Sequence, residues 1–161
     1  MNRLKPGPGQ ESVWDYPRPP KLEPTPKRIQ VKLGDLTIAD SSRAYRVLET
    51  SHPPVYYLPQ TDIRMELMEP TARHSVCEWK GGASYWSLRA AGKILVNVAW
   101  GYLEPTPAFR PIAGHLAFYL DPLEGFVDSE QAGPQPGRFY GGWITRDIVG
   151  PFKGGPGSMG W

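Results

Sequence analysis

Glu78, Lys80 and Tyr85 bring a carboxylate, an ammonium and a phenol into one short segment of the chain. Residues 77–86 contain two short aromatic runs around Gly81-Gly82, and a glycine pair supplies the positive φ angles of a two-residue β-turn. This pattern predicts a β-hairpin in which Glu78 lies opposite Tyr85 and Lys80 shares their face. In a pocket, the lysine would hold an anion and the carboxylate would accept a proton. On an open surface, the same residues would form an ordinary charge pair.

The other face of this hairpin is expected to carry Cys77, Trp79, Trp86 and Leu88, because side chains alternate along a strand. This face is apolar and aromatic, so we expect it to face the core. Cys77 is the only cysteine and is a candidate nucleophile. A thiol in apolar surroundings has a raised pKa and little thiolate, which favours a structural role.

A second candidate segment, residues 49–57, concentrates polar groups beside two prolines. The Pro53-Pro54 step holds a loop in an extended form and would fix His52 in position. His52 is therefore a candidate acid/base group, together with Glu49 and Glu78. The simpler alternative is a stiff turn that places Tyr56 or Tyr57 in the core.

Arginine and aromatic residues elsewhere suggest a surface that holds an anion and stacks on a ring. The candidates for ligand binding are Arg46, Arg64, Glu78, Lys80, Tyr85 and Trp100, with Arg64 as an anion clamp. The net charge is only +2, and the basic residues are scattered. Affinity for a nucleic-acid polymer would therefore be weak, and a mononucleotide or another small anion fits better.

The sequence argues against metal and membrane sites. A single cysteine excludes an internal disulfide and a zinc site with several thiolates. The three histidines (His52, His74 and His115) lack short-range ligand spacing, so we expect no metal and no cofactor. The first ten residues lack the apolar stretch of a signal peptide, and no apolar run approaches the length of a membrane span. A cytoplasmic protein is expected.

The composition predicts a β domain with many turns. The chain has 161 residues, with 19 prolines, 18 glycines and six tryptophans, and it contains no convincing long amphipathic helix. We expect a Pro-rich arm over residues 1–28, a β domain over 29–130 and a Gly/Pro-rich aromatic tail over 131–161. The tail is expected either to pack on the domain or to take part in oligomerisation.

Short alternating runs mark the expected strands within residues 29–130. The clearest is the pair 29–33 and 36–39, joined by a turn at Gly34-Asp35. Further strands are expected at 55–58, 63–68, 94–100 and 116–120, with one helical turn at 108–113. Residues 45–49 fit a strand or a helical turn, and the strand is favoured. Together they predict a single antiparallel β domain, in the form of a tent or a small barrel or sandwich.

The runs Val47–Pro59, Cys77–Gly81 and Ala99–Tyr102 resemble the family catalogued as domain of unknown function 427, sometimes labelled nucleotidyltransferase-like. The resemblance covers roughly residues 29–120, and the arm and tail resemble longer bacterial members. It implies a fold similar to the Mss4-like β-tent group. Several members of that group hold zinc with paired cysteines, which this chain lacks. The resemblance brings no catalytic residues, and the Gly-Ser turn and paired aspartates of a nucleotidyltransferase are not found.

Three functions remain open on this basis. The first is binding of a small anion, with nucleotide-like anions among the candidates, in a cleft between the 77–86 hairpin and the 49–57 loop. The second is an enzyme in which Glu49, His52 or Glu78 does acid/base work. The third is an interaction or homo-oligomerisation module that acts through the Pro-rich arm and the aromatic tail.

Overall fold

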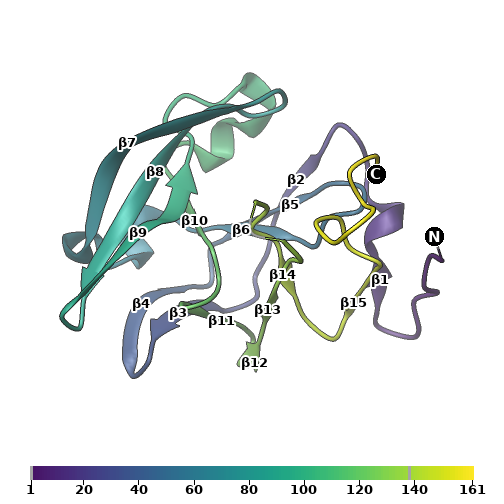
Figure 1. The fold of residues 1–161 in the computed structure, drawn as a ribbon, viewed down its shortest axis with the longest axis horizontal. Coiled ribbons are helices and arrows are strands. Elements are labelled where there is room, and N and C mark those ends of the chain that lie inside the picture. Colours follow the sequence, from purple (N-terminus) through teal and green to yellow (C-terminus); the bar gives the residue numbers. More distant parts are fainter. Residues whose placement is uncertain (1, 138) are drawn as a thin grey trace.

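Short antiparallel strands dominate the computed structural model, which describes residues 2–137 and 139–161 (Figure 1). The prediction of a mainly β protein is confirmed. Prolines and glycines lie between most strands, because proline cannot donate to a β-ladder and glycine permits tight turns.

The longest strands form a four-stranded antiparallel sheet in the order β10-β9-β8-β7 (Figure 1). Its strands are β7 (Met68–Cys77), β8 (Gly81–Ala90), β9 (Lys93–Gly101) and β10 (Leu116–Phe118). The 3₁₀ helix η4 (Pro107–Ile112) lies between β9 and β10 and corresponds to the predicted helical turn. Two shorter 3₁₀ helices, η2 (Gln60–Asp62) and η3 (Met65–Leu67), precede β7.

A second four-stranded sheet has the order β12-β11-β3-β4. It consists of β3 (Ile29–Leu33), β4 (Leu36–Ser41), β11 (Glu124–Val127) and β12 (Glu130–Gln131). β3 and β4 form the hairpin expected around Gly34, whose φ of 59° is the left-handed conformation that glycine adopts readily. Apolar side chains of this sheet pack with those of the first sheet in the main core, which includes Ile29, Leu88 and Trp143.

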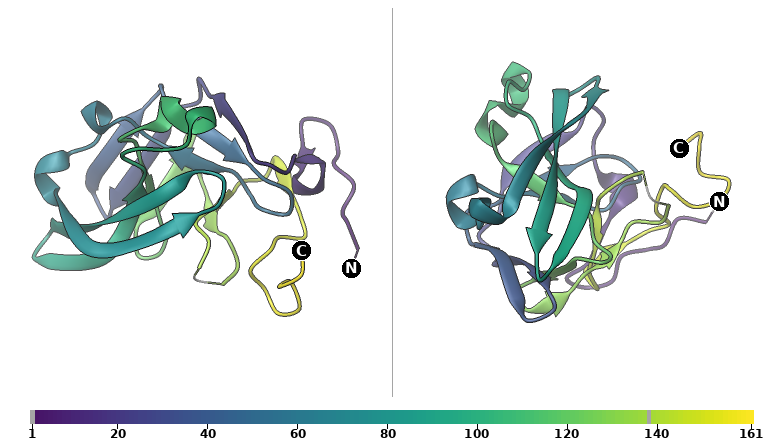
Figure 2. Two further views of the ribbon diagram at one scale, coloured as in Figure 1. Left: turned by 90° about the horizontal axis from the view of Figure 1, so that it is seen from above. Right: turned by 60° about the vertical axis from the view of Figure 1, so that its left-hand side comes forward.

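A three-stranded sheet in the order β2-β5-β6 joins the N-terminal part of the chain to the predicted β domain. Its strands are β2 (Lys21–Pro24), β5 (Tyr45–Leu48) and β6 (Val55–Tyr57). The N-terminal and C-terminal segments lie together at one end of the molecule (Figures 1 and 2). There β1 (Glu11–Ser12) pairs in parallel with β15 (Ile148–Val149), and η1 (Val13–Asp15) follows β1. The last pair is β13 (Gly133–Pro134) with β14 (Trp143–Ile144).

The hairpin between β7 and β8 differs from the predicted one. Cys77 pairs with Gly81, so residues 78–80 form the turn and Gly81-Gly82 begins the second strand. The cause is a contact from outside the hairpin: the backbone N–H of Thr106 donates to the carbonyl of Lys80 (3.0 Å), and its hydroxyl donates to the carbonyl of Trp79 (2.6 Å). Gly81 has a φ of 105° and lies beside the backbone of residues 104–106.

This change of register exchanges the two predicted faces, because it shifts the pairing by an odd number of residues. Tyr85 packs in one apolar cluster with Cys77 and Trp79, from which the prediction had separated it. Trp86 and Leu88 instead belong to the main core. Glu78 and Lys80 project from the turn rather than from a strand, so the predicted strand face of Glu78, Lys80 and Tyr85 is wrong.

The strand expected at 63–68 is also absent as such. The 3₁₀ helix η3 occupies residues 65–67 of this segment, and β7 begins only at Met68. The N–H of Arg64 donates to the carbonyl of Ile38, after which the N–H of Leu67 donates back to Arg64 and closes the turn. Alternating apolar residues therefore did not distinguish a strand from a tight helical turn here.

Candidate functional site

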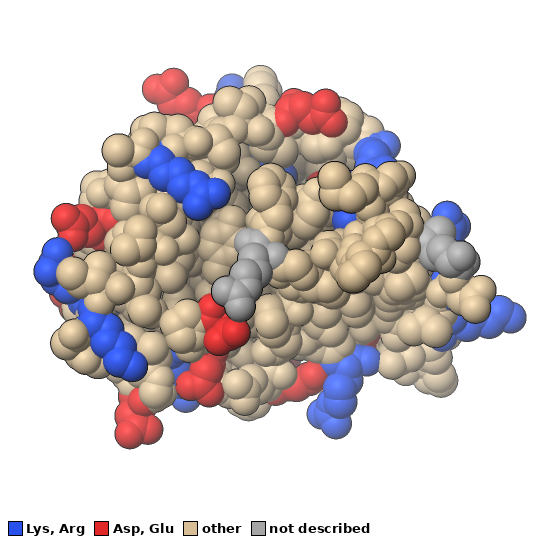
Figure 3. Space-filling view, viewed as in Figure 1, with Lys and Arg blue, Asp and Glu red and all other residues tan. Residues whose placement is uncertain are grey.

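A cleft of about 410 Å³ lies between the turn at residues 78–80, the loop that follows β5 and the C-terminal segment. Its walls include six of the residues singled out in the sequence: Glu49, His52, Glu78, Lys80, Tyr85 and Trp100. The face of the molecule in Figure 3 carries lysine and arginine interspersed with aspartate and glutamate, and the charged side chains described there form no patch of one sign. The lining of the cleft likewise mixes both signs, with Glu49 and Glu78 beside Lys80 and Lys153.

Aromatic side chains form most of the apolar lining. Tyr57 and Trp100 are buried at the base, where the indole Nε1 donates to the Tyr57 hydroxyl (3.3 Å). Tyr119 packs on Trp100 with ring centroids 4.4 Å apart. Burial raises the pKa of Tyr57 and raises that of Tyr119 to about 12, so both phenols stay protonated and uncharged at neutral pH.

Lys80 is the unusual cation of the cleft, because its side chain is buried without a carboxylate partner. Only 8% of the residue is exposed, and no carboxylate among the described residues lies within ion-pair distance of its Nζ atom. The Nζ atom lies 5.8 Å from the ring centroid of Tyr102 and 5.7 Å from that of Phe109. Cation–π contacts of this kind compensate only part of the cost of burying a charge.

His52 is held in a defined orientation by Gln135. The Gln135 amide is fixed at both ends, because its Oε1 accepts from the N–H of Gly142 (3.1 Å) and its Nε2 donates to the carbonyl of Lys153 (2.8 Å). The same Nε2 lies 3.0 Å from His52 Nδ1, so Nδ1 is the acceptor. The proton of the neutral imidazole is therefore on Nε2, 3.9 Å from Glu49 Oε2.

The environment of His52 keeps the imidazole uncharged. Burial lowers its pKa, and the positive charges of Lys153, Arg18 and Lys80 lower it further, to about 4. The only carboxylate within ion-pair distance of the imidazole among the described residues is that of Glu49, and it also lies 3.9 Å from Arg18 Nε. The three cations that lower the pKa of His52 therefore outnumber the one carboxylate within ion-pair distance of the imidazole.

Two glycines allow the C-terminal segment to close the cleft. A Cβ atom on Gly141 would lie 2.1 Å from the Trp100 ring, and one on Gly142 would lie 2.5 Å from the carbonyl oxygen of Pro53. Both distances are far shorter than van der Waals contact. Only glycine fits at these positions, so the segment lies directly against Trp100 and the Pro53 backbone.

Two predicted ligand-binding residues lie outside this cleft. Arg46 is committed to an ion-pair network, in which its guanidinium donates to the carboxylates of Glu11 and Glu23. Arg64 is half exposed and pairs with Glu66 at 3.0 Å. Neither lines the cleft, so the structure does not place Arg46 and Arg64 with the other candidates.

Sequence reasoning missed the part of the cleft that comes from the C-terminal segment. Gln135, Tyr140 and Lys153 all line it. The Tyr140 ring packs edge-on against the His52 imidazole at 4.7 Å, and Lys153 Nζ lies 5.7 Å from the Tyr140 ring centroid. The one available signal was the Gly-Gly pair between Tyr140 and Trp143, because such glycines often mark a close approach of the backbone.

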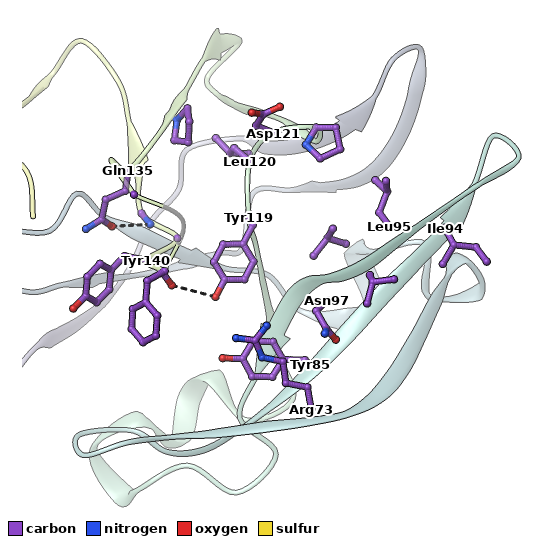
Figure 4. A pocket seen from close by; sticks show the side chains of 18 residues that line it. Arg73, Tyr85, Ile94, Leu95, Asn97, Tyr119, Leu120, Asp121, Gln135 and Tyr140 are labelled. Atoms are coloured by element: carbon purple, nitrogen blue, oxygen red, sulfur yellow. Dashed lines mark hydrogen bonds between the residues drawn. The ribbon is translucent and has the colours of Figure 1, made fainter. Parts of the chain in front are cut away.

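A second cleft of about 470 Å³ adjoins the first (Figure 4). The two share the residues Tyr85, Tyr119, Gln135, Phe139, Tyr140 and Gly141. In Figure 4, Arg73 lies against Tyr85, with its guanidinium carbon 4.6 Å from the ring centroid. The Tyr119 hydroxyl donates to the carbonyl of Phe139 (3.4 Å), so the boundary between the clefts runs through these two residues.

Comparison with known proteins identifies the family but not an activity. The model of the family described as Domain of unknown function (DUF427), with the short label NTP_transf_9, matches residues 21–129. The chain belongs to this family. No curated protein matches the chain. Gln135, Tyr140 and Lys153 lie beyond the matched residues, so the family's common region does not contain the whole cleft.

Residues 2–137 and 139–161 contain no group of three or more histidine, cysteine, aspartate and glutamate side chains arranged to hold a metal ion. Within the same part of the chain, no helix has both the length and the apolar character needed to cross a membrane.

Proposed function

We propose that the cleft binds a small organic anion. The observation that carries this proposal is Lys80, a buried ammonium without a carboxylate partner in the part of the chain that the structure describes. A buried charge is costly unless it is paired and hydrogen-bonded. An anionic group in the cleft would supply that partner.

The cations that act on His52 and its donor also favour an anion at this end of the cleft. Lys153 lines the same cleft, and Arg18, Lys80 and Lys153 all act on His52 to lower its pKa. The neutral imidazole offers an Nε2–H donor at this end. Glu49 provides an acceptor nearby, so a ligand that carries a hydroxyl or amine beside its anionic group would also be satisfied.

The proposal of an enzyme rests on the Glu49–His52 pair. A general base works best when its pKa is close to the operating pH, and a pKa of about 4 makes His52 a weak base near neutrality. We therefore place binding first and acid/base catalysis by Glu49, His52 or Glu78 second. Three expectations from the sequence remain proposals: that the anion is a nucleotide, that the fold is a β-tent, and that the arm and tail mediate homo-oligomerisation.

A thermal-shift screen of the full chain tests the proposal. The panel comprises inorganic phosphate, citrate, ribose 5-phosphate, AMP, benzoate and 2-naphthoate, each offered to wild type, Lys80→Met and Lys93→Met. Lys93 is an exposed lysine at the start of β9 and serves as the matched control. A ligand at ~100 times its Kd adds about 2.7 kcal/mol, or about 5–11 °C in a chain of this size.

The expected result is a shift with at least one anion in wild type and Lys93→Met, and its loss in Lys80→Met. The methionine keeps the apolar stem and removes an unpaired buried charge, so the variant should melt within a few degrees of wild type or above it. Shifts that are equal in wild type and Lys80→Met would refute the proposal.

A further inference from the structure

The mouth of the cleft carries an aromatic ring with little protein around it. Phe139 is 74% exposed, although it lines both clefts. Its ring meets Tyr140 edge-on at 4.9 Å between centroids, which leaves most of its surface open. Trp79, half-buried in the turn at 78–80, also lines the cleft. Two separate segments thus contribute a ring that lies partly open to solvent.

The lining of the cleft is also mainly aromatic. Aromatic residues outnumber aliphatic ones along the cleft, whose aliphatic side chains are those of Val47, Val55 and Val76. Its aromatic residues are Tyr57, Trp79, Tyr85, Trp100, Tyr102, Tyr119, Phe139 and Tyr140. Aromatic rings interact best with other rings, in offset-stacked or edge-to-face arrangements, and such pairs contribute beyond the area they bury. A flexible aliphatic ligand would gain no such contribution.

The dimensions also suit a ring system with one anionic substituent. A volume of about 410 Å³ lies within the range of ordinary small-molecule sites. Lys80, Lys153 and the Nε2–H of His52 can bind the anionic group, and aromatic rings contact all three and line the cleft with them. The adjoining cleft gives further space past Tyr119 for a ring that is larger than one nucleobase.

We infer that the ligand is an aromatic anion, a carboxylate or phosphate carried on a planar ring system. This inference rests on the anion-binding function proposed above and specifies the part of the ligand that carries the anionic group. The anionic group lies at the Lys80 end, and the ring lies against Trp100 and Tyr119. Phe139 and Trp79 cover the ring at the mouth.

Matched probe pairs separate the ring from the charge. The carboxylate pair is 2-naphthoate and its saturated analogue decalin-2-carboxylate. The phosphate pair is AMP and ribose 5-phosphate. Dissociation constants are measured by calorimetry on wild type, Lys80→Met, Phe139→Ser and Trp79→Leu, with Leu103→Ser as a control for the loss of an exposed apolar side chain (Leu103 is 64% exposed). Thermal melts confirm that each variant is folded.

The aromatic member of at least one pair is expected to bind at least fivefold more tightly than its partner, which corresponds to a stacking contribution of about 1 kcal/mol. The pair that shows the preference identifies the anionic group as carboxylate or phosphate. Phe139→Ser and Trp79→Leu should each reduce this ratio at least twofold, and Leu103→Ser should leave it unchanged.

The remaining outcomes distinguish failure of the aromatic inference from failure of the anion-binding proposal. If both members of each pair bind equally and Lys80→Met abolishes both, the anion site stands and the aromatic inference fails. If the preference survives in both Phe139→Ser and Trp79→Leu, the ring is not covered at this mouth and the inference fails as stated. If no probe binds, or binding is the same in Lys80→Met, the proposed function fails and the inference fails with it.

Discussion

His52 makes the stability of the protein depend on pH in a defined window. The imidazole is buried and uncharged, with a pKa of about 4 in the folded chain. In the unfolded chain, the same group has a pKa of about 6.5. Between these values, the unfolded state binds more protons than the folded state. The stability contributed by neutral His52 is therefore fully present above pH ~6.5 and is lost as the pH falls toward 4.

The size of the effect follows from the two pKa values. Each pKa unit corresponds to 1.36 kcal/mol, so complete protonation removes about 3 kcal/mol of unfolding free energy. For a chain of this length, that is a fall of about 6–12 °C in Tm. Carboxylates with lowered pKa, such as Asp147, also lose their ion pairs at low pH, so the His52 contribution must be isolated by a difference.

The assay compares wild type with His52→Gln in urea denaturation between pH 4 and pH 8. The variant cannot titrate at this position but keeps a side-chain oxygen that can accept from Gln135. Wild type should lose about 3 kcal/mol more than the variant across the window, because all other groups are common to both chains. Proton NMR of the imidazole, assigned by its absence in His52→Gln, should show His52 still neutral at pH 5.5.

A parallel pH dependence of wild type and His52→Gln, together with an imidazole midpoint near 6.5, would refute this reasoning. It would mean that His52 is solvated rather than buried among Gln135 and the three cations. The assignment of a neutral imidazole with an Nε2–H donor in the cleft would then also be incorrect.

Three further predictions concern Gly141 and Gln135 at the cleft and Arg46 outside it. Gly141→Ala should lower stability by about 1–3 kcal/mol, because its Cβ would meet the buried Trp100 ring, whereas Gly82→Ala, with open space at its Cβ, should change it by less than about 1 kcal/mol in thermal melts. Gln135→Ala should weaken binding of the best anion found in the thermal-shift screen, because the His52 imidazole loses the amide that orients it, as followed by calorimetry; an unchanged Kd would contradict the positioning role. Arg46→Gln should cost about 2 kcal/mol in urea denaturation, because it leaves two carboxylates without their shared cation, while Arg64→Gln should cost no more than about 1 kcal/mol; equal losses would contradict the difference in burial.

Local signals in the sequence were sufficient for part of the fold. The β3–β4 hairpin was predicted correctly, because its alternation and its glycine turn act within one short segment. The β7–β8 hairpin was not, because Thr106 binds the carbonyls of the turn from a distant part of the chain and selects another register. Local propensity could not reveal that contact.

The candidate site divides in the same way. Glu49, His52, Glu78 and Lys80 were singled out by residue type, and the structure brings them to one cleft even though the hairpin register differs. Arg46 was also singled out, but its guanidinium pairs with Glu11 of the N-terminal arm and does not line the cleft. Gln135 and Lys153 depend on how the C-terminal segment wraps back onto the loop at 49–55, which neither spacing nor composition encodes.

The measurement that tests the central claim most directly is a calorimetric titration of wild type and Lys80→Met with 2-naphthoate, with Lys93→Met as the control. Charge-assisted hydrogen bonds contribute about 1.5–3 kcal/mol, so the account predicts that Lys80→Met weakens binding about 10- to 150-fold while Lys93→Met matches wild type. A folded Lys80→Met protein that binds 2-naphthoate as tightly as wild type, or a wild-type protein that binds neither 2-naphthoate nor AMP at millimolar concentrations, would contradict it.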